Sequence, residues 1–251
     1  MMGGLSASAL VDAWERGILG GPGERALIAL EEAGASDPAA LGVAERDRLL
    51  AHLRALTFGD AIDAVIECPA CAAQMTFELS CTELIRASGT EARAPTPTVD
   101  LLREDLLVAL RLPTAGDLAA TATAADVRTA ERAILARCAK LTDGVGARHD
   151  LERLSAESID ELAGEFDRLI AAEAPLSLST LSLRCPSCEH AWEAPLDFGE
   201  FLWTEIDAEA RRLLGDVHVL ASAYGWSERE ILALRPLRRD AYLRQCAGDA
   251  P

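Results

Sequence analysis

The sequence predicts an α+β protein that is mainly helical and carries a large inserted subdomain. Two matching motifs, Cys68-Pro69-Ala70-Cys71 and Cys185-Pro186-Ser187-Cys188, are each flanked by strand-like sequence. Most of the remaining chain has the apolar periodicity of amphipathic helices. The motifs are separated by 113 residues (72–184), which is long enough for a subdomain of its own.

The two motifs together provide the ligands of a structural metal site. Four thiolates in two Cys-Pro-x-Cys turns are the ligand set of a tetrahedral zinc ion, with no position left open. We therefore expect structural zinc on Cys68, Cys71, Cys185 and Cys188. Ordinary zinc ribbons have ~15–20 residues between their Cys pairs. The predicted fold is thus α+β, mainly helical, with a split four-cysteine zinc ribbon and an inserted α/β subdomain.

The sequence around each Cys pair alternates apolar and polar residues, as half-buried strands do. The expected strands occupy 61–67, 75–79, 176–183 and 192–196, with one slip near Ser179-Thr180 that a bulge would explain. When the Cys pairs are aligned, a helix start follows the second strand in both halves. The chain therefore repeats the order strand, turn, strand, helix.

Other chemistry of paired cysteines fits this sequence less well. A thioredoxin-like redox site needs its Cys pair at a helix N-terminus, whereas strand-like sequence follows both pairs here. Disulfides are disfavoured because there are seven cysteines, an odd number, and the chain opens without a secretory signal. Two alternatives stay open: a zinc ion shared between two chains, and replacement of one ligand by His190, although four sulfurs already suffice.

Four regions are expected along the chain. They are an N-terminal helical region (1–58), the split zinc ribbon (59–85 and 176–198), the inserted α/β subdomain (95–175) and a C-terminal helical region (199–251). Pro95-Thr96-Pro97 marks the start of the insertion. In the first region we expect helices over 5–17, 23–34 and 43–56.

Within the insertion, a strand over 106–112 ends at Pro113. Thr114 with Asp117 has the spacing of a capping box, and Thr123 with Asp126 repeats it. The expected elements that follow are a helix over 127–138 with Cys138 on its apolar face, a loop over 142–150 and a helix over 156–173.

The C-terminal region contains the longest predicted helix, over 198–223. Gly225 suits its left-handed C-cap, and Ser227 with Glu230 forms a capping box for the next helix. Pro236 then opens a last helix that runs to Leu243.

The spacing from Leu220 to Leu234 also matches a DNA-binding helix-turn-helix. Five arginines, interleaved with acidic residues, make this tail locally basic: Arg229, Arg235, Arg238, Arg239 and Arg244. The net charge of the chain is −17, and a zinc tetrathiolate would bring it to about −19, which repels phosphate backbones. We therefore expect these helices to bind protein rather than nucleic acid. A zinc-containing DNA-binding regulator is the alternative function.

The sequence has no enzyme signature and no membrane signature. It lacks a Gly-rich phosphate loop, a Gly-x-Ser-x-Gly motif and a His-Glu-x-x-His motif. A closed tetrathiolate site does not activate water, so we expect no catalytic residues and no small-molecule substrate. No apolar run approaches the ~20 residues of a membrane span, and the first residues have no basic n-region, so a cytoplasmic protein is expected.

Three segments resemble one known family. Residues 110–118 resemble the Phe-Arg-Leu-Pro-Thr-x-x-Asp-Leu stretch of T-even-phage-type baseplate proteins, with Leu110 in place of the aromatic residue. The forms found in bacterial contractile phage-tail-like particles also carry two Cys-Pro-x-Cys pairs. They share Phe-Leu-Trp-x-Glu-Ile, here 201–206, and a closing pattern from His218 to Leu234. The resemblance spans most of the chain, from Trp14 to Tyr242.

The resemblance implies a structural or assembly component of the baseplate of a phage tail or contractile phage-tail-like injection particle. It implies other baseplate or tail proteins as partners and incorporation into an assembled particle. No functional residues are carried over beyond the four cysteines.

Overall fold

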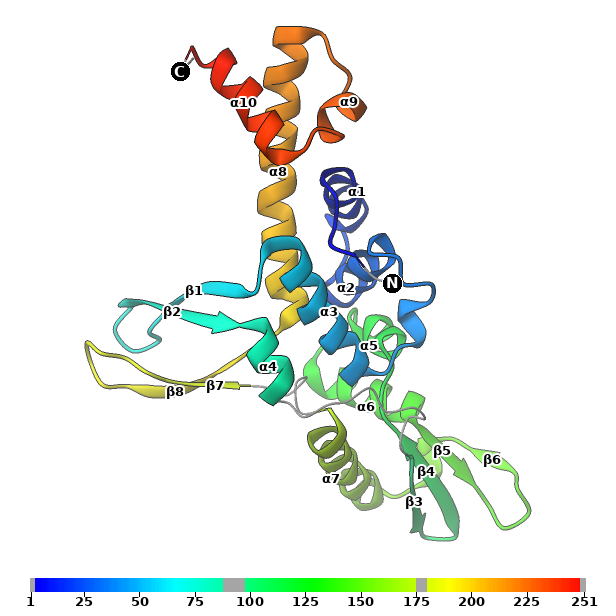
Figure 1. Cartoon of the computed structure of the whole chain (residues 1–251). Helices are drawn as coiled ribbons and strands as arrows, with labels where there is room; N and C mark the ends of the chain where they lie inside the picture. Colours follow the sequence, from blue (N-terminus) through cyan, green and yellow to red (C-terminus); the bar gives the residue numbers. More distant parts are fainter. Residues whose placement is uncertain (1–2, 88–97, 175–179, 249–251) are drawn as a thin grey trace.

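The computed structural model describes residues 3–87, 98–174 and 180–248 (Figure 1). The Pro95-Thr96-Pro97 boundary, the edges of the expected insertion at 95 and 175, and the slip at Ser179 lie outside these residues. Within the described residues the chain is α+β and mainly helical, as the sequence predicts. None of the described helices has both the length and the apolarity that crossing a bilayer requires.

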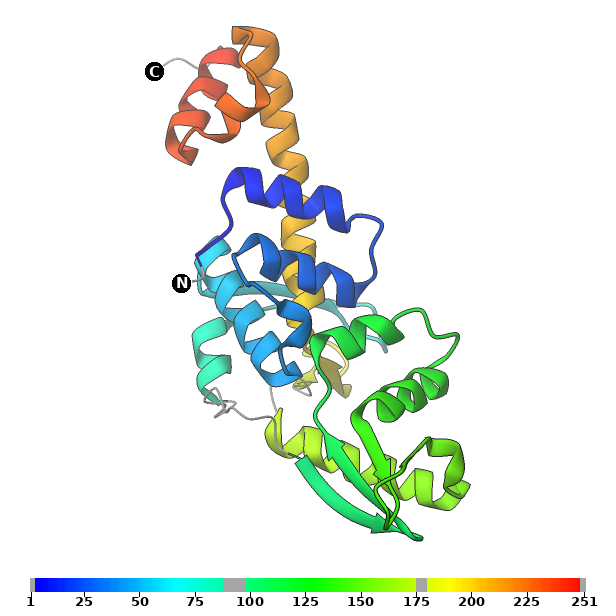
Figure 2. The same cartoon turned by 90° about the vertical axis from the view of Figure 1, so that its right-hand side faces the viewer.

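The N-terminal helices pack against the longest helix of the chain. They are α1 (Ala7–Gly17), α2 (Pro22–Glu32) and α3 (Val43–Phe58), with a 3-10 turn η1 (Pro38–Ala40) before α3. Ser6 caps α1 by accepting a hydrogen bond from the Ala9 N–H. Figure 2 shows α1 and α2 crossing α8 (Phe198–Tyr224). The fully buried aliphatic residues of this helical body include Leu30, Leu50, Leu53, Leu202, Ile206 and Leu213.

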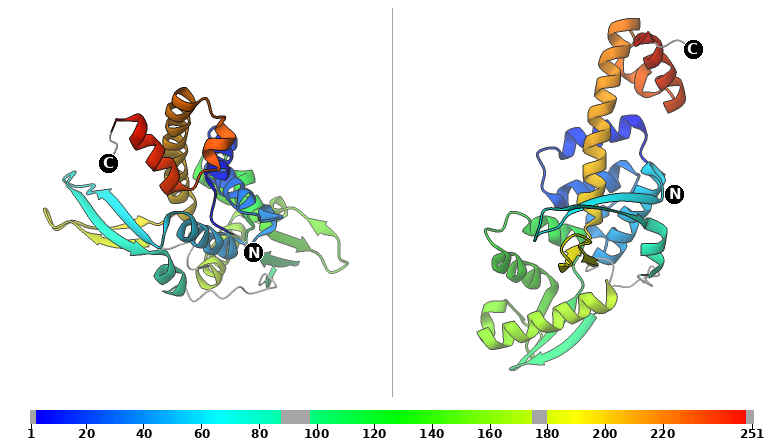
Figure 3. Two further views of the ribbon diagram at one scale, coloured as in Figure 1. Left: turned by 45° about the horizontal axis from the view of Figure 1, so that its top comes forward. Right: turned by 90° about the vertical axis from the view of Figure 1, so that its left-hand side faces the viewer.

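Two β-hairpins extend from this helical body on the same side (Figure 3). The first pairs β1 (Ala61–Glu67) with β2 (Gln74–Ser80), and the second pairs β7 (Thr180–Arg184) with β8 (Ala191–Pro195). Each hairpin is a separate two-stranded antiparallel sheet. A helix follows each second strand, α4 (Cys81–Ala87) after β2 and α8 after β8, which is the predicted repeat of strand, turn, strand, helix.

The residues between the hairpins form a second core around a four-stranded antiparallel sheet. Its order is β3 (Thr98–Arg103), β4 (Leu106–Arg111), β5 (Ala139–Thr142) and β6 (Arg148–His149). The helices are α5 (Ala115–Thr121), α6 (Val127–Cys138) and α7 (Ala156–Glu173), with a 3-10 turn η2 (Leu151–Arg153) before α7. No residue of this core belongs to the core of the helical body.

Several expectations for the insertion need correction. The loop expected over 142–150 is shorter than predicted: residues 143–147 connect the strands, whereas Thr142 ends β5 and Arg148–His149 form β6. Asp126 does not take part in a second capping box, because it is itself the N-cap of α6 and accepts from the Thr129 N–H at 2.7 Å. Val127 is 74% exposed, whereas Cys138 is buried as expected. The apolar face of α6 therefore develops only toward its C-terminal end.

The C-terminal helices pack on the far end of α8. Gly225 takes the left-handed conformation (φ +69°) that ends α8. The predicted capping box of Ser227 and Glu230 begins α9 (Glu228–Leu232), and Pro236 opens α10 (Pro236–Cys246). Tyr224, the last residue of α8, is 39% exposed and stacks on Trp226 with ring centroids 4.7 Å apart.

Candidate metal centre

Both Cys pairs lie in the turns at the ends of the hairpins, and the two turns have the same backbone hydrogen bonds. In each turn the first cysteine donates its N–H to the carbonyl five residues later, and its own carbonyl accepts from the N–H four residues later. These bonds are Cys68 N to Ala73 O (3.0 Å), Ala72 N to Cys68 O (2.9 Å), Cys185 N to His190 O (2.9 Å) and Glu189 N to Cys185 O (2.9 Å). The motif repeat is therefore also a repeat of backbone structure.

The two turns also share an unusual backbone conformation. Ala72 has φ +59° and Glu189 has φ +61°, a left-handed region that residues other than glycine rarely adopt. Each is the residue directly after the second cysteine of its pair. Sequence reasoning missed these positions because neither is a glycine, and the only signal was their equal spacing from the two Cys pairs.

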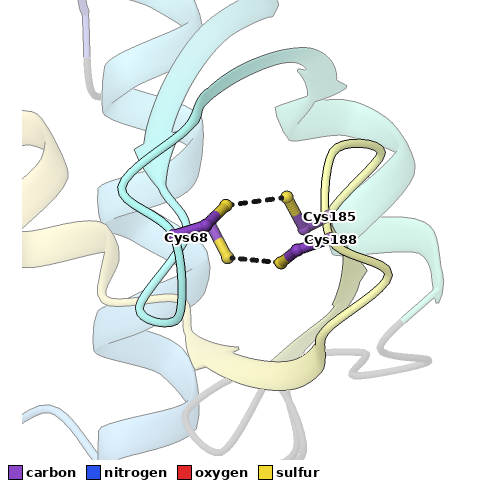
Figure 4. Close-up of side chains that lie close together, drawn as sticks. Cys68, Cys185 and Cys188 are labelled. Carbon is purple, nitrogen blue, oxygen red and sulfur yellow. Dashed lines mark hydrogen bonds between the residues drawn. The ribbon is translucent and has the colours of Figure 1, made fainter.

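The two turns bring four sulfur atoms together. The Sγ atoms of Cys68, Cys71, Cys185 and Cys188 all lie within 4.8 Å of one another. The Cys68 and Cys188 sulfurs are 3.7 Å apart, and the Cys71 and Cys185 sulfurs are 3.6 Å apart. Figure 4 shows Cys68 facing Cys185 and Cys188 across the gap between the turns.

The size and chemistry of this cluster fit zinc. Zn²⁺ binds thiolate sulfur at about 2.3 Å, so the edges of a tetrahedral site measure about 3.8 Å. The two closest cross-turn separations, 3.7 and 3.6 Å, are close to that value. Sulfur atoms would occupy all four positions around the ion. The arrangement suits a structural site and leaves no place for a metal-bound water.

The electrostatics of the cluster also favour a bound cation. Burial opposes ionisation of Cys185, but the N–H groups of Cys188 and Ser187 and the neighbouring thiols lower its pKa to about 6. An N–H of Ala73 favours the Cys71 thiolate, yet the thiols of Cys188 and Cys185 raise the pKa of Cys71 to about 12. The four thiols therefore cannot all ionise near neutral pH without a compensating charge, which a divalent ion provides.

The other candidate ligand and the remaining cysteines lie elsewhere. His190 is not in the cluster. Its ring stacks on Trp192 at a centroid distance of 5.9 Å, and its carbonyl accepts the hydrogen bond from the Cys185 N–H. Cys81 and Cys138 are buried, one in each apolar core, and Cys246 is partly exposed on α10. Neither Cys pair lies at a helix N-terminus, as a thioredoxin-like site would require.

The first hairpin is anchored to the helical body by a buried arginine. Arg54 is 4% exposed, and its Nε and Nη2 donate to the Glu205 carboxylate at 2.9 and 2.6 Å. Its Nη1 donates to the carbonyls of Gly59 and Ala61, where β1 begins. Glu205 belongs to the Phe-Leu-Trp-x-Glu-Ile segment, so this segment links α8 to α3 and to the hairpin that carries Cys68.

The segment over residues 110–118 is a junction between the elements that follow β3. Asp117 is 4% exposed and completes the predicted capping box with Thr114. Arg111 Nη1 lies 2.6 Å from Asp117 Oδ2, and Arg137 Nε lies 2.9 Å from Asp117 Oδ1. Burial alone would raise the pKa of Asp117, but Arg111, the Thr114 N–H and Arg137 hold it well below the usual range. The carboxylate thus joins β4, α5 and α6. The spacing of Thr114 and Asp117 predicted the capping box, but not the ion pairs with Arg111 and Arg137.

Fold and site together define an α+β protein whose main candidate site is a closed cluster of four cysteines. Residues 29–203, which include both Cys pairs, match the family model described as T4 bacteriophage base plate protein. The matched region covers more than two thirds of the 251 residues. The chain therefore belongs to the T4 bacteriophage base plate protein family. Its class is that of structural phage baseplate proteins. No curated protein and no solved structure matches it.

Proposed function

We propose that this protein is a structural or assembly component of the baseplate of a phage tail or contractile phage-tail-like injection particle, stapled by one structural zinc ion. Membership of the baseplate family supports the role. The observation that carries the zinc proposal is the convergence of four sulfurs from two turns 113 residues apart in the sequence. An ion bound there would join the two ends of the insertion.

The proposed zinc site has Cys68, Cys71, Cys185 and Cys188 as ligands from a single chain. The four Sγ atoms already lie together within one chain, which favours this arrangement over an ion shared between two chains. Zinc would fix the tips of two hairpins whose strands do not hydrogen-bond to each other. The proposed role of the ion is structural: it holds the two hairpins in one relative geometry and takes part in no reaction.

We also propose that the chain is organised in the four regions given by the sequence. The separation of the two apolar cores supports an inserted subdomain between the hairpins. Limited proteolysis tests this division, because Val145 in the β5–β6 connection is 91% exposed. We expect early cleavage within 143–147 and slow cleavage within α6. Preferential cleavage inside α6 would contradict the proposed subdomain.

The proposed partners are other baseplate or tail proteins, and no catalytic step is assigned to the protein. We propose that it is made in the bacterial cytoplasm and incorporated into the assembled particle. Mass spectrometry of purified sheathed particles from the source cell tests this role. The protein should co-purify with sheath and baseplate components, and a Cys185→Ser variant should be depleted. Its complete absence from intact particles and from their assembly intermediates would contradict the proposal.

The alternative, a DNA-binding regulator, finds less support in the C-terminal helices. A recognition helix presents its N-terminal residues to the bases, and α9 has five residues with Glu228 and Glu230 in its first turn. Arg239, one of the arginines of the basic tail, is 2% exposed and lies 3.1 Å from Asp216 as an ion pair. It is therefore not available to contact a phosphate backbone on the outer surface.

A further inference from the structure

A cavity of about 620 Å³ lies between the start of α1 and the α9–α10 connection. Figure 1 shows α9 directly beyond α1, on the same side of α8. The wall combines aliphatic and cationic side chains, among them Leu5, Leu232, Leu234, Arg229, Arg235 and Arg239. This volume is in the range of ligand pockets and is far larger than one small inorganic ion requires.

The guanidinium of Arg239 has unused hydrogen-bonding capacity at this cavity. The residue is 2% exposed, its Nε lies 3.1 Å from Asp216 Oδ2 as an ion pair, and its Nη1 is buried without a hydrogen-bond partner. Its ion-pair partner Asp216 also receives Arg212 Nη1 at 3.0 Å, so that one carboxylate is shared by two arginines. The Nη1 donor is thus buried without an acceptor, which is costly, and a negative charge beside it would lower that cost.

Two further features make the cavity favourable for a negative charge. Helix α10, eleven residues long, begins here with Pro236, and its N-cap residue Arg235 provides no side-chain cap. The dipole of a helix favours an anion near its N-terminal end; the contribution here is the dipole alone, because Pro236 has no N–H and the Arg238 and Arg239 N–H groups bond to the Arg235 carbonyl. The exposed side chains of Arg229 and Arg235 also line the cavity, against a single acidic lining residue, Glu228. A chain with net charge −17 thus has a locally positive cavity.

We infer that this cavity binds a carboxylate of an acidic protein segment, with a neighbouring aliphatic side chain against its apolar wall. The arginines supply donors for the carboxylate, with Arg239 beneath and Arg229 and Arg235 at the rim. Pro236, which is exposed, and Leu234, which is half-buried, offer apolar surface beside them, which a bare inorganic anion would leave unused. The inference goes beyond the proposed function and does not depend on zinc or on the type of particle.

The probe for this site is a fluorescein-labelled peptide of alternating leucine and glutamate, measured by fluorescence anisotropy with the full-length protein. Arg235→Glu and Arg229→Glu should each weaken binding at least about tenfold, because each replaces a donor by a repelling charge. The matched control is Arg238→Glu, an exposed residue of α10 that does not line the cavity. It makes the same change in net charge and should alter binding by less than about twofold. Thermal melting of each variant verifies that the fold is retained.

Three results would overturn the inference. The first is no binding of the peptide up to about 1 mM, an affinity too weak for a specific site. The second is equal weakening by Arg238→Glu, which would indicate attraction by overall charge. The third is equal binding of a leucine–glutamine peptide, or displacement of the acidic peptide by inorganic phosphate at the same concentration. Equal binding of the glutamine peptide would show that the carboxylate is not recognised. Displacement by phosphate would show that the site does not prefer a peptide carboxylate to an inorganic anion.

Discussion

The helical body and the paired hairpins both bring together segments that are far apart in the sequence, but by different means. In the helical body, α1, α2 and α3 meet α8 through fully buried side chains such as Leu30 and Ile206. In the hairpins, many strand residues are exposed, as Val65 is at 65%, and no strand of one hairpin pairs with the other. What converges at the hairpin tips is four sulfur atoms.

This difference suggests how each region responds to change. Apolar burial is spread over many side chains, so the loss of any one contact should lower the stability of the helical body without unfolding it. A four-ligand site is cooperative, because one missing ligand alters the whole coordination sphere. The hairpins should therefore be the region whose structure depends most on a few atoms.

The largest expected effect is that of Cys68→Ser or Cys185→Ser. Zinc binding contributes ~10–16 kcal/mol to the folding of zinc-finger peptides. Removing one of the four ligands should abolish most of the corresponding zinc-binding free energy in this protein. Bound zinc and the melting temperature should both fall. Hydrogen exchange should rise in 61–80 and 180–195 while α8 stays protected.

Cys246→Ser is the matched control, because Cys246 is a lone, partly exposed thiol outside the cluster. It should leave zinc content and exchange rates unchanged. Equal loss of protection in the hairpins and in α8 after Cys68→Ser would erase the distinction between the two regions.

A smaller effect is expected at the junction that Asp117 forms between β4, α5 and α6. Asp117→Ala removes the N3 partner of the Thr114 capping box and leaves Arg111 and Arg137 without their carboxylate, which should cost about 2–4 kcal/mol of unfolding free energy. Asp126 is an exposed N-cap whose carboxylate makes no ion pair with an arginine side chain in the described part of the chain, although Arg128 lies near it, and Asp126→Ala should cost only about 1 kcal/mol. Urea denaturation measures both, and equal costs would show that the arginine pairs contribute nothing.

The pKa of Asp117 also predicts a pH dependence. Because its pKa is lower in the folded protein, its contribution to stability is fully present above the unfolded value of about 3.9. That contribution is lost as the pH falls from this value toward the folded pKa. The difference in unfolding free energy between the wild type and Asp117→Asn should therefore shrink below about pH 4. A difference that stays constant across this range would exclude the carboxylate as its source.

The smallest effects concern two helical glycines in the helical body. A Cβ at Gly17 would lie 2.5 Å from Cη2 of the Trp203 ring, so Gly17→Ala should destabilise by about 1–3 kcal/mol despite the better helix propensity of alanine. A Cβ at Gly215 meets nothing within 4 Å, and Gly215→Ala should stabilise by about 0.5–1 kcal/mol. Thermal melts of both variants test the close packing of α1 on α8. Equal shifts of the same sign would contradict it.

The sequence predicted features whose causes are local. The helices over 43–58, 156–173 and 198–224 follow from apolar periodicity and capping residues, and the family resemblance is confirmed by the match over 29–203. The Cys68 pair and the Cys185 pair could be matched because the same motif and the same strand pattern occur twice.

The features that were missed depend on contacts between distant residues. Strands β3, β5 and β6 are short, from two to six residues, and owe their structure to pairing, β3 and β5 with β4 and β6 with β5. Arg239 was grouped with Arg238 as part of a basic surface, yet Arg239 is buried against Asp216. Charge reversal at Arg239 would therefore disturb folding, so tests of binding belong at the exposed arginines.

The most direct test of the central claim is native mass spectrometry of the freshly purified, reduced protein. An intrachain site for Cys68, Cys71, Cys185 and Cys188 predicts one zinc ion per monomer, lost in Cys68→Ser and retained in Cys246→Ser. A metal-free monomer with folded hairpins, or one zinc ion held only by dimers, would contradict the account.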